Sequence, residues 1–554
     1  MASLQPLGGL LGDQRASHLL RRSTFGFTAA DVASFAQKTP GQAVDDLLNF
    51  PTVPPPPKDP ATGASWIPGG TTSNSSSGDT LRSIILTWWL DESFTTTSLA
   101  QKMMLFLHQN FVNNLSVRST DLYYQLSLFR KYAKGSYKTL AEKMCMDNSM
   151  LVYLNSQQSS RTSPNENFPR ELLELFTIGK GPQVAPGNYT TYTEDDIKEA
   201  SRLFTGFRMD LTRNTLDPDT GFPMGDTNTW KHDATNKTFS PAFGNTVIQG
   251  RSTASGMIDE QKDFITMVFN QKATALNICR KLYRFFVHHD ITSEVESDII
   301  DPLATLLKTN NYNLDPVLKK LFKSEHFYDK DDTVEGDEVI GGLIKSPLDL
   351  FLGTMQYFQI PLPDKVTDPN TYYRSFFKNV FFGYLCIEAG MEVYNPIDVA
   401  GYPAYYQQPA MDDLWVSGTT LSFRYLFADM LISGTKELST NSLIIQLDAM
   451  AFVNNPQNIP AYSGADAFGN PGPHPGPQVA GHLVDTLVKA LFPRPIEQAR
   501  RDYFLNDLLL GNLSERNWHF EWLNYVATGN DATVKPQIES LIRGIIQSPE
   551  YQLG

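Results

Sequence analysis

The segment 164–179, an expected apolar helix with three charges between Asn167 and Gly179, constrains this chain more than any other segment. Asn167 is expected to cap its start, because an Asn side-chain oxygen accepts an orphan backbone N–H. Pro169 suits the first turn, where its missing donor costs nothing, and Gly179 suits the left-handed position that ends many helices. Such a helix is either a salt-bridged core helix or the wall of an active site. Its charged residues are Arg170, Glu171 and Glu174.

Two carboxylates of this helix, on Glu171 and Glu174, are three residues apart and are expected to share a face. A pair of carboxylates on one face can hold a hard cation or divide into general acid and base. Arg170 and Glu174 are four residues apart, so an intrahelical ion pair is the structural alternative. Buried charges demand partners, and Arg170 would then be that partner. The residues alone leave both interpretations open.

Three histidine-containing segments offer further candidates. His108 lies late in an apolar helix expected over residues 99–111, as a metal ligand, a general base or a core histidine near a helix end. His232 lies with Asp233 and Lys237 in a polar loop, where the acid can orient the imidazole and the lysine can bind an anion. Exposed polar surface is the alternative for this loop. The third segment is His18 with Arg21 and Arg22, interpreted as surface charge rather than as an anion-binding cluster.

Hydrophobic periodicity predicts a mainly α protein, a large multi-helix globular chain with long irregular loops. Apolar residues recur at helical spacings over residues 99–111, 276–287 and 479–491, and Thr193 with Asp196 approximates a capping box. No stretch shows sustained strand alternation. We expect two helical portions, residues 1–330 and 331–554, packed as one body. Loops are expected at 51–78, 209–256, 329–337 and 454–478.

Charge and composition exclude several classes of partner. The formal net charge of −14 argues against a nucleic-acid partner, which requires a basic surface. No run of about 18 apolar residues is present, so no membrane span is expected. The first residues lack the charged and apolar regions of a signal peptide. The motifs of serine hydrolases, phosphate-binding loops, zinc proteases and dinucleotide-binding domains are missing from the sequence.

The helix at 164–179 resembles the signature of the DUF1800 family, bacterial proteins with a domain of unknown function. Other family segments follow in the right order along nearly the whole chain. Within them, Gln109 stands where the family often has Asn, Asn110 where it often has His, and Asp398 where it has Asn. The matching segments are residues 18–27, 107–111, 192–197, 203–207, 232–239, 281–287, 345–347, 395–402 and 548–551.

The resemblance implies a periplasmic or extracellular location, although no signal peptide is visible, and a DUF1501-like, sulfatase-related protein as partner. We expect a hydrolase that acts on an envelope or extracellular polymer. A divalent metal ion is the candidate cofactor, and a non-catalytic helical scaffold or partner protein is the alternative. The candidate catalytic residues are Glu171, Glu174, His108, His232 and Asp233, and the candidate substrate-binding residues are Arg170, Lys237 and Asn167.

Overall fold

The structure is a computed structural model that describes residues 2–67, 76–115, 117–331, 338–436 and 443–554. Part of the loop expected at 51–78, namely residues 68–75, lies outside the described residues. The same holds for residues 332–337 of the acidic turn expected at 329–337. None of the helices described is both long and apolar enough to cross a bilayer.

Helices dominate the described residues, which confirms the mainly α prediction. The first helices are α1 (Gly12–Ser23), α2 (Ala29–Ala36), α3 (Pro40–Leu47), α4 (Gly78–Asp91), α5 (Ala100–Asn110), α6 (Ser119–Tyr132), α7 (Tyr137–Met144), α8 (Asn148–Tyr153) and α9 (Asn167–Glu171). The middle of the chain forms α10 (Glu194–Leu203), α11 (Ala254–Phe269), α12 (Lys272–Phe286), α13 (Ser293–Val295), α14 (Asp301–Thr309), α15 (Leu314–Phe322) and α16 (Pro347–Tyr357). The last helices are α17 (Gly418–Ser433), α18 (Ala449–Asn454), α19 (Ala480–Leu491), α20 (Gln498–Asp502), α21 (Glu515–Thr528) and α22 (Val534–Ile546).

Wider and tighter helical turns interrupt or extend these helices. The π-helical segments are η3 (Leu172–Phe176), η5 (Glu296–Ile300), η7 (Thr371–Cys386) and η11 (Tyr503–Leu509). The 3₁₀ turns are η1 (Glu92–Phe94), η2 (Ser156–Gln158), η4 (Pro241–Phe243), η6 (His326–Tyr328), η8 (Pro403–Tyr405), η9 (Met411–Trp415), η10 (Gly476–Gln478) and η12 (Glu550–Gln552).

The strands of the described residues are short and form antiparallel pairs only. The expected loop at 209–256 contains the strand pair β5–β6 and the second strand of the pair β3–β4, because the chain there has no helical periodicity. The pairs are β1 (Gln183–Ala185) with β2 (Asn188–Tyr189), β3 (Phe207–Arg208) with β4 (Asp226–Thr227), β5 (Lys237–Thr238) with β6 (Val247–Ile248), and β7 (Thr435–Lys436) with β8 (Leu443–Ile445).

The helices predicted from periodicity lie close to their expected bounds. α5 matches the segment 99–111, α12 contains the apolar face expected at 276–287, and α19 matches 479–491. α10 begins behind a complete capping box, in which the Thr193 backbone N–H donates to Asp196 over 2.8 Å. Local apolar spacing and caps therefore suffice to place these helices.

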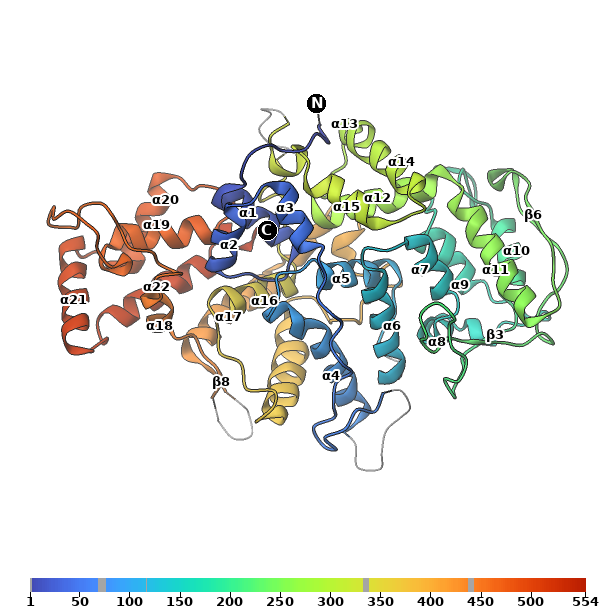
Figure 1. Cartoon of the computed structure of the whole chain (residues 1–554), viewed down its shortest axis with the longest axis horizontal. Coiled ribbons are helices and arrows are strands. Elements are labelled where there is room, and N and C mark those ends of the chain that lie inside the picture. Colours follow the sequence, from blue (N-terminus) through green and yellow to red (C-terminus); the bar gives the residue numbers. More distant parts are fainter. Residues whose placement is uncertain (1, 68–75, 116, 332–337, 437–442) are drawn as a thin grey trace.

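The chain does not run through the molecule from one end to the other (Figure 1). Helices α18–α22 form one end of an elongated body, α7–α11 lie at the other end, and α1–α5 occupy the centre. α1 packs against α19, and α4 packs against η7. The boundary expected at residue 330 stays a prediction.

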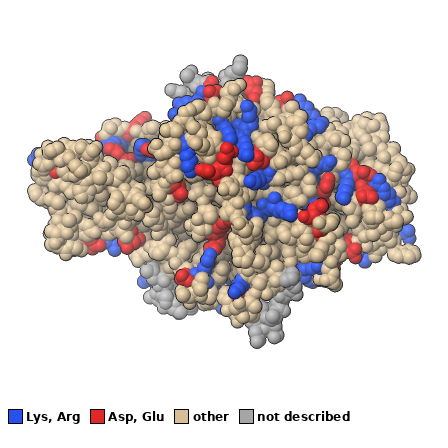
Figure 2. Space-filling model, in the orientation of Figure 1, with Lys and Arg blue, Asp and Glu red and all other residues tan. Residues whose placement is uncertain are grey.

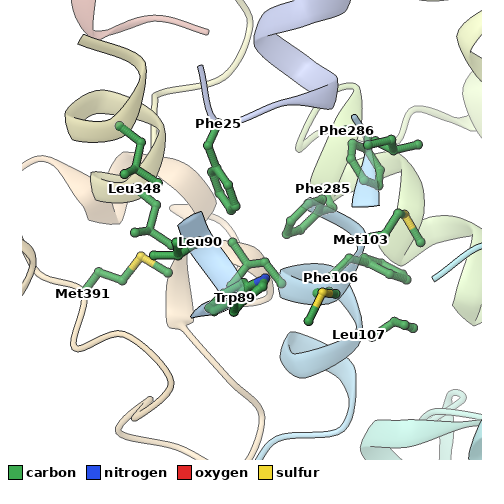
Figure 3. Close-up of a cluster of buried hydrophobic side chains, with 14 of the residues drawn as sticks. Phe25, Trp89, Leu90, Met103, Phe106, Leu107, Phe285, Phe286, Leu348 and Met391 are labelled. Carbon is green, nitrogen blue, oxygen red and sulfur yellow. The ribbon is translucent and has the colours of Figure 1, made fainter. Parts of the chain in front are cut away.

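A continuous hydrophobic core joins the early and late parts of the chain. Figure 3 shows its centre, where side chains of α4, α5 and α12 lie beside Phe25, Leu348 and Met391. The rings of Phe25 and Trp89 meet edge to face at 6.4 Å, and those of Phe106 and Phe285 at 5.5 Å. The core therefore fixes α12 against α5, and this contact forms one wall of the site described below.

Charged side chains of both signs lie beside one another on the face drawn in Figure 2, and the end formed by α21 carries few of them. The net charge of −14 is thus distributed rather than gathered into one acidic patch on this face.

Candidate functional site

The signature helix consists of an α-helical turn followed by a π-helical segment. α9 begins at Asn167 and passes into η3 at Leu172. Asn167 is the first residue of the helix rather than its cap. Glu166 is the N-cap and makes no side-chain capping bond, while the Asn165 side chain accepts the Asn167 backbone N–H over 2.8 Å. Gly179 adopts the left-handed conformation, with φ +75°, and its N–H donates to the Leu173 carbonyl over 2.9 Å. Single π-helical turns of this kind often occur at functional sites.

The intrahelical ion pair considered for Arg170 and Glu174 does not form. Arg170 makes a bidentate pair with Glu194 of α10, at 2.8 and 2.9 Å, and a third bond of 3.0 Å to Glu166. Glu174 instead pairs with Lys180 and accepts a hydrogen bond of 3.2 Å from Tyr192. Arg170 therefore joins α9 to α10. Glu171 and Glu174 have different surroundings.

Glu171 is partly buried. Its carboxyl makes no hydrogen bond or ion pair with any described residue. Burial, together with the nearby charges of Glu174 and Asp398, raises the pKa of Glu171 to about 7 against the opposing effect of Arg170. A carboxyl group in this range is half protonated near neutral pH, which suits a general acid.

A cavity of about 190 Å³ lies between η3, α5, α12 and the loop before η8. Glu174 forms part of its wall, and Asp398, whose charge acts on Glu171, directly precedes lining residues. Glu174 therefore lines the cavity, whereas Glu171, three residues earlier on the same helix, does not. Its lining residues are Phe106, Gln109, Asn110, Glu174, Leu175, Asn277, Lys281, Arg284, Phe285, Val399, Ala400, Tyr405 and Tyr406.

Two basic residues of α12 line the cavity. Lys281 donates a hydrogen bond to the Leu175 carbonyl, and burial together with the charge of Arg284 lowers the pKa of Lys281 to about 7. Arg284 has no hydrogen bond or ion pair with any described residue, and its Nε is buried. Burial also lowers the pKa of Arg284. Lysines with pKa values near neutrality serve as bases or nucleophiles in enzymes.

His108 is a core histidine in this structure. Its ring stacks on Tyr394 at 3.9 Å, and its Nε2 donates to the Asn113 carbonyl over 3.1 Å. Burial lowers the pKa of His108 to about 4, which keeps the ring neutral. It does not line the cavity, whereas the next two residues, Gln109 and Asn110, do.

Gln109 holds the loop that closes the cavity. Its Nε2 donates to the Ala400 carbonyl over 3.1 Å, and its Oε1 accepts the Tyr402 N–H over 2.9 Å. A Cβ at Gly401, where φ is +97°, would lie 2.2 Å from the Gln109 Nε2, so glycine is required there. Gln109, which departs from the family pattern, thus holds this loop in place through its two backbone hydrogen bonds.

The loop residues His232 and Lys237 are buried rather than exposed, against the surface interpretation of this loop. His232 Nε2 lies 3.2 Å from Glu260 Oε1, and Lys237 Nζ lies 2.5 Å from Glu260 Oε2. Glu260 belongs to α11, and these bonds lower its pKa although burial alone would raise it. Asp233 pairs with Arg202 at 2.9 Å. This triad, Glu260 with His232 and Lys237, attaches the loop to α11.

The helix α10 separates the triad from the glutamate pair. Arg170 binds Glu194 at the first residue of α10, and Asp233 binds Arg202 near its end. Eight residues of α-helix span about 12 Å. The structure therefore brings Glu174 together with residues of α12 at the cavity, and leaves His232, Asp233 and Lys237 in a different place. Their catalytic and binding roles stay predictions.

In the described part of the chain, no three His, Cys, Asp or Glu side chains lie close enough together to hold a metal ion. The divalent metal expected from the glutamate spacing thus has no ready-made ligand set within the residues described.

Sequence reasoning missed Lys281 and Arg284 as site residues. Both lie in the segment 281–287, which was noted only as part of the family pattern. Two basic residues three positions apart in an otherwise apolar helical stretch were the available signal, because charges on a buried face require a reason.

The family model named "Protein of unknown function (DUF1800)" matches residues 18–553. No curated protein and no solved structure matches the chain. A match over nearly the whole length establishes membership, and the chain belongs to the DUF1800 family, whose function is unknown.

Proposed function

We propose that this protein is a hydrolase that acts by general acid–base catalysis on a polymer of the cell envelope or extracellular space. One observation carries the proposal: the Lys281 amine, with its pKa lowered to about 7, lines a cavity together with Glu174, and the Glu171 carboxyl, with its pKa raised to about 7, lies three residues before Glu174 on the same helix. Neutral-range pKa values at a cavity are typical of catalytic acids and bases.

The roles follow from the surroundings of each group. Glu171, in its protonated form, donates a proton to the leaving-group oxygen as the bond to the polymer breaks. Lys281, in its neutral form, accepts a proton from the attacking water, and exchange with solvent restores both groups. The amide side chains of Asn110 and Asn277 line the same cavity and supply hydrogen bonds to a polar substrate.

These assignments predict a bell-shaped pH profile of kcat/KM centred near pH 7. The rate falls above this pH as Glu171 loses its proton, and below it as Lys281 gains one. The test is hydrolysis of a panel of chromogenic esters, glycosides and phosphate esters together with dye-labelled envelope polymers. Glu171→Gln is expected to lower kcat by about 10²- to 10⁴-fold and to remove the alkaline limb.

Glu166→Gln is the matched control, because it makes the same chemical change on the same segment at a carboxylate that is already paired with Arg170. It is expected to retain the rate. Equal rates for the wild type and a correctly folded Glu171→Gln variant on every substrate that is hydrolysed would refute the proposal.

A non-catalytic partner protein is the second candidate. It is favoured by the internal ion pairs of Arg170 and Lys237, which hold helices and loops together rather than face a ligand. The DUF1501-like partner belongs to this candidate. Thermal melting combined with activity and binding assays separates the two. A Glu171→Gln variant that stays folded but is inactive favours the enzyme. A folded wild-type protein that hydrolyses none of the substrates but binds such a partner favours the scaffold. His108→Ala is less informative, since His108 stacks in the core.

A further inference from the structure

A second cavity, of about 70 Å³, lies where α1, α12, α16 and the last residues of the chain meet. Arg21 and Arg22 line it, so these residues are buried, against the surface role expected from the sequence. Two carboxylates, of Asp349 and Asp412, also line it. The other basic side chains of its wall are Lys102, Arg284, His289 and Lys345.

The two carboxylates are already engaged. Asp349 pairs with Lys102. The Oδ2 of Asp412 accepts the Ile344 backbone N–H over 2.6 Å, and its Oδ1 lies 2.8 Å from the His289 Nδ1 without a hydrogen bond. Neither makes an ion pair with the remaining cations of the cavity. The wall therefore holds more positive than negative charge after internal pairing.

Neutral groups alone accept hydrogen bonds from the remaining cations. Arg21 donates to the Ala490 carbonyl over 2.5 Å, and Arg22 donates to the Val339 carbonyl over 2.6 Å. The corresponding bond of Lys345 goes to the Tyr551 carbonyl, at 2.6 Å. Arg284 has no such bond within the described residues, and the Nε atoms of Arg22 and Arg284 are buried without a partner.

Burying cations without counter-charge is costly, and the pKa values of this cavity record that cost. Burial lowers the pKa of Arg21 and of Arg22 to about 10, and lowers that of Lys345 well below its usual value. A bound anion would remove much of this penalty. Guanidinium groups bind oxyanions through paired N–H donors, and a cavity of this volume holds several waters or one small oxyanion.

We propose that this cavity is a binding site for a tetrahedral oxyanion, a phosphate or sulfate group, held by Arg21, Arg22, Arg284 and Lys345. The site adjoins the acid–base cavity, because Arg284, Phe285 and Tyr405 line both. This last step rests on the proposed function: the oxyanion is a substituent of the polymer that the neighbouring cavity hydrolyses.

The test is titration of the full-length protein with inorganic phosphate or sulfate at constant ionic strength, followed by thermal melting and by calorimetry. A saturable rise in melting temperature is expected, since a ligand that binds only the folded state stabilises it. Sodium chloride at the same ionic strength is expected to give no saturable rise.

Arg284→Met is the informative variant, because Arg284 makes no bond whose loss would unfold the protein. We expect it to weaken phosphate binding at least 10-fold, and Lys345→Met to do the same. Arg280→Met is the matched control: it lies one turn earlier on α12, makes the same charge change, and pairs with Glu296 away from the cavity.

Equal stabilisation by chloride and phosphate, or unchanged phosphate binding in a folded Arg284→Met variant, would overturn the inference. The absence of phosphate and sulfate binding in calorimetry would overturn it too. Glu171→Gln is expected to bind phosphate like the wild type. Phosphate binding without hydrolysis of any substrate would therefore reject the proposed function and retain the oxyanion site. Competition with phosphate by a polymer that carries phosphate or sulfate groups would identify that polymer as the source of the oxyanion.

Discussion

Glu171 and Glu174 show how two identical side chains on one helix acquire different chemistry. Glu174 has a lysine and a tyrosine within bonding distance, whereas Glu171 has neither and lies partly buried beside the negative charges of Glu174 and Asp398. The spacing of three residues was visible in the sequence. The difference between the residues was not, because Lys180, Tyr192 and Asp398 reach the helix only through the fold.

The raised pKa of Glu171 predicts a pH-dependent stability. The folded chain binds this proton more tightly than the unfolded chain, so the ionisation of Glu171 costs stability as the pH rises from about 4.5 to about 7. Glu171→Gln removes that cost. It is expected to be about 2 kcal/mol more stable than the wild type at pH 8, with allowance for partial exposure, and equally stable at pH 4.

Denaturant unfolding at several pH values measures this effect. Glu194→Gln provides the opposite case, because the hydrogen bond from Arg170 lowers the pKa of Glu194 and its stabilisation is present at neutral pH. This variant should lose stability at pH 8. A constant difference between Glu171→Gln and the wild type from pH 4 to pH 8 would show that Glu171 has an ordinary pKa.

Element positions in this protein follow local rules where the apolar spacing is regular. α5, α10, α12 and α19 were predictable from that spacing and, for α10, from its complete capping box. The start of α9 was not, because the helix begins at Asn167 behind Glu166, which makes no side-chain capping bond. Ion pairs between elements, as in the triad that holds the loop to α11, were likewise not predictable from the sequence.

The triad predicts a large and compensable stability loss. Lys237→Met leaves Glu260 buried without its full counter-charge and is expected to cost about 3–5 kcal/mol. The double variant Lys237→Met/Glu260→Gln should recover part of the loss, because it removes the uncompensated charge. Urea unfolding of the single and double variants measures both values.

Lys198→Met is the matched control for the triad, since Lys198 pairs with Asp195 on the exposed face of α10. No measurable change is expected there. A double variant that loses as much stability as the sum of its single variants would show that Lys237 and Glu260 do not act as a pair.

At the scale of the whole molecule, α1 ties the early and late parts of the chain together. It packs against α19, and its two arginines donate to carbonyls of residues 339 and 490. Both cavities lie where these parts meet, so neither can be assembled from one portion of the chain.

A fragment of residues 1–330 is therefore expected not to fold cooperatively. It would leave Phe25 and Trp89 without Leu348 and Met391, and Arg21 and Arg22 without their carbonyl partners. Near-ultraviolet circular dichroism and denaturant unfolding of the fragment, beside the full chain, measure this. A sharp unfolding transition of the fragment would instead establish residues 1–330 as an independent domain.

The sequence by itself determined the helical class, the position of most long helices and the family, because apolar spacing, caps and ordered motifs are local properties. Only the tertiary structure decided which polar residues meet. It placed Glu174, Lys281 and Arg284 at one cavity, buried His108 and the triad elsewhere, and buried Arg21 and Arg22. The physical reason is that pKa values and ion pairs depend on burial and on partners distant in the chain, which no local pattern encodes.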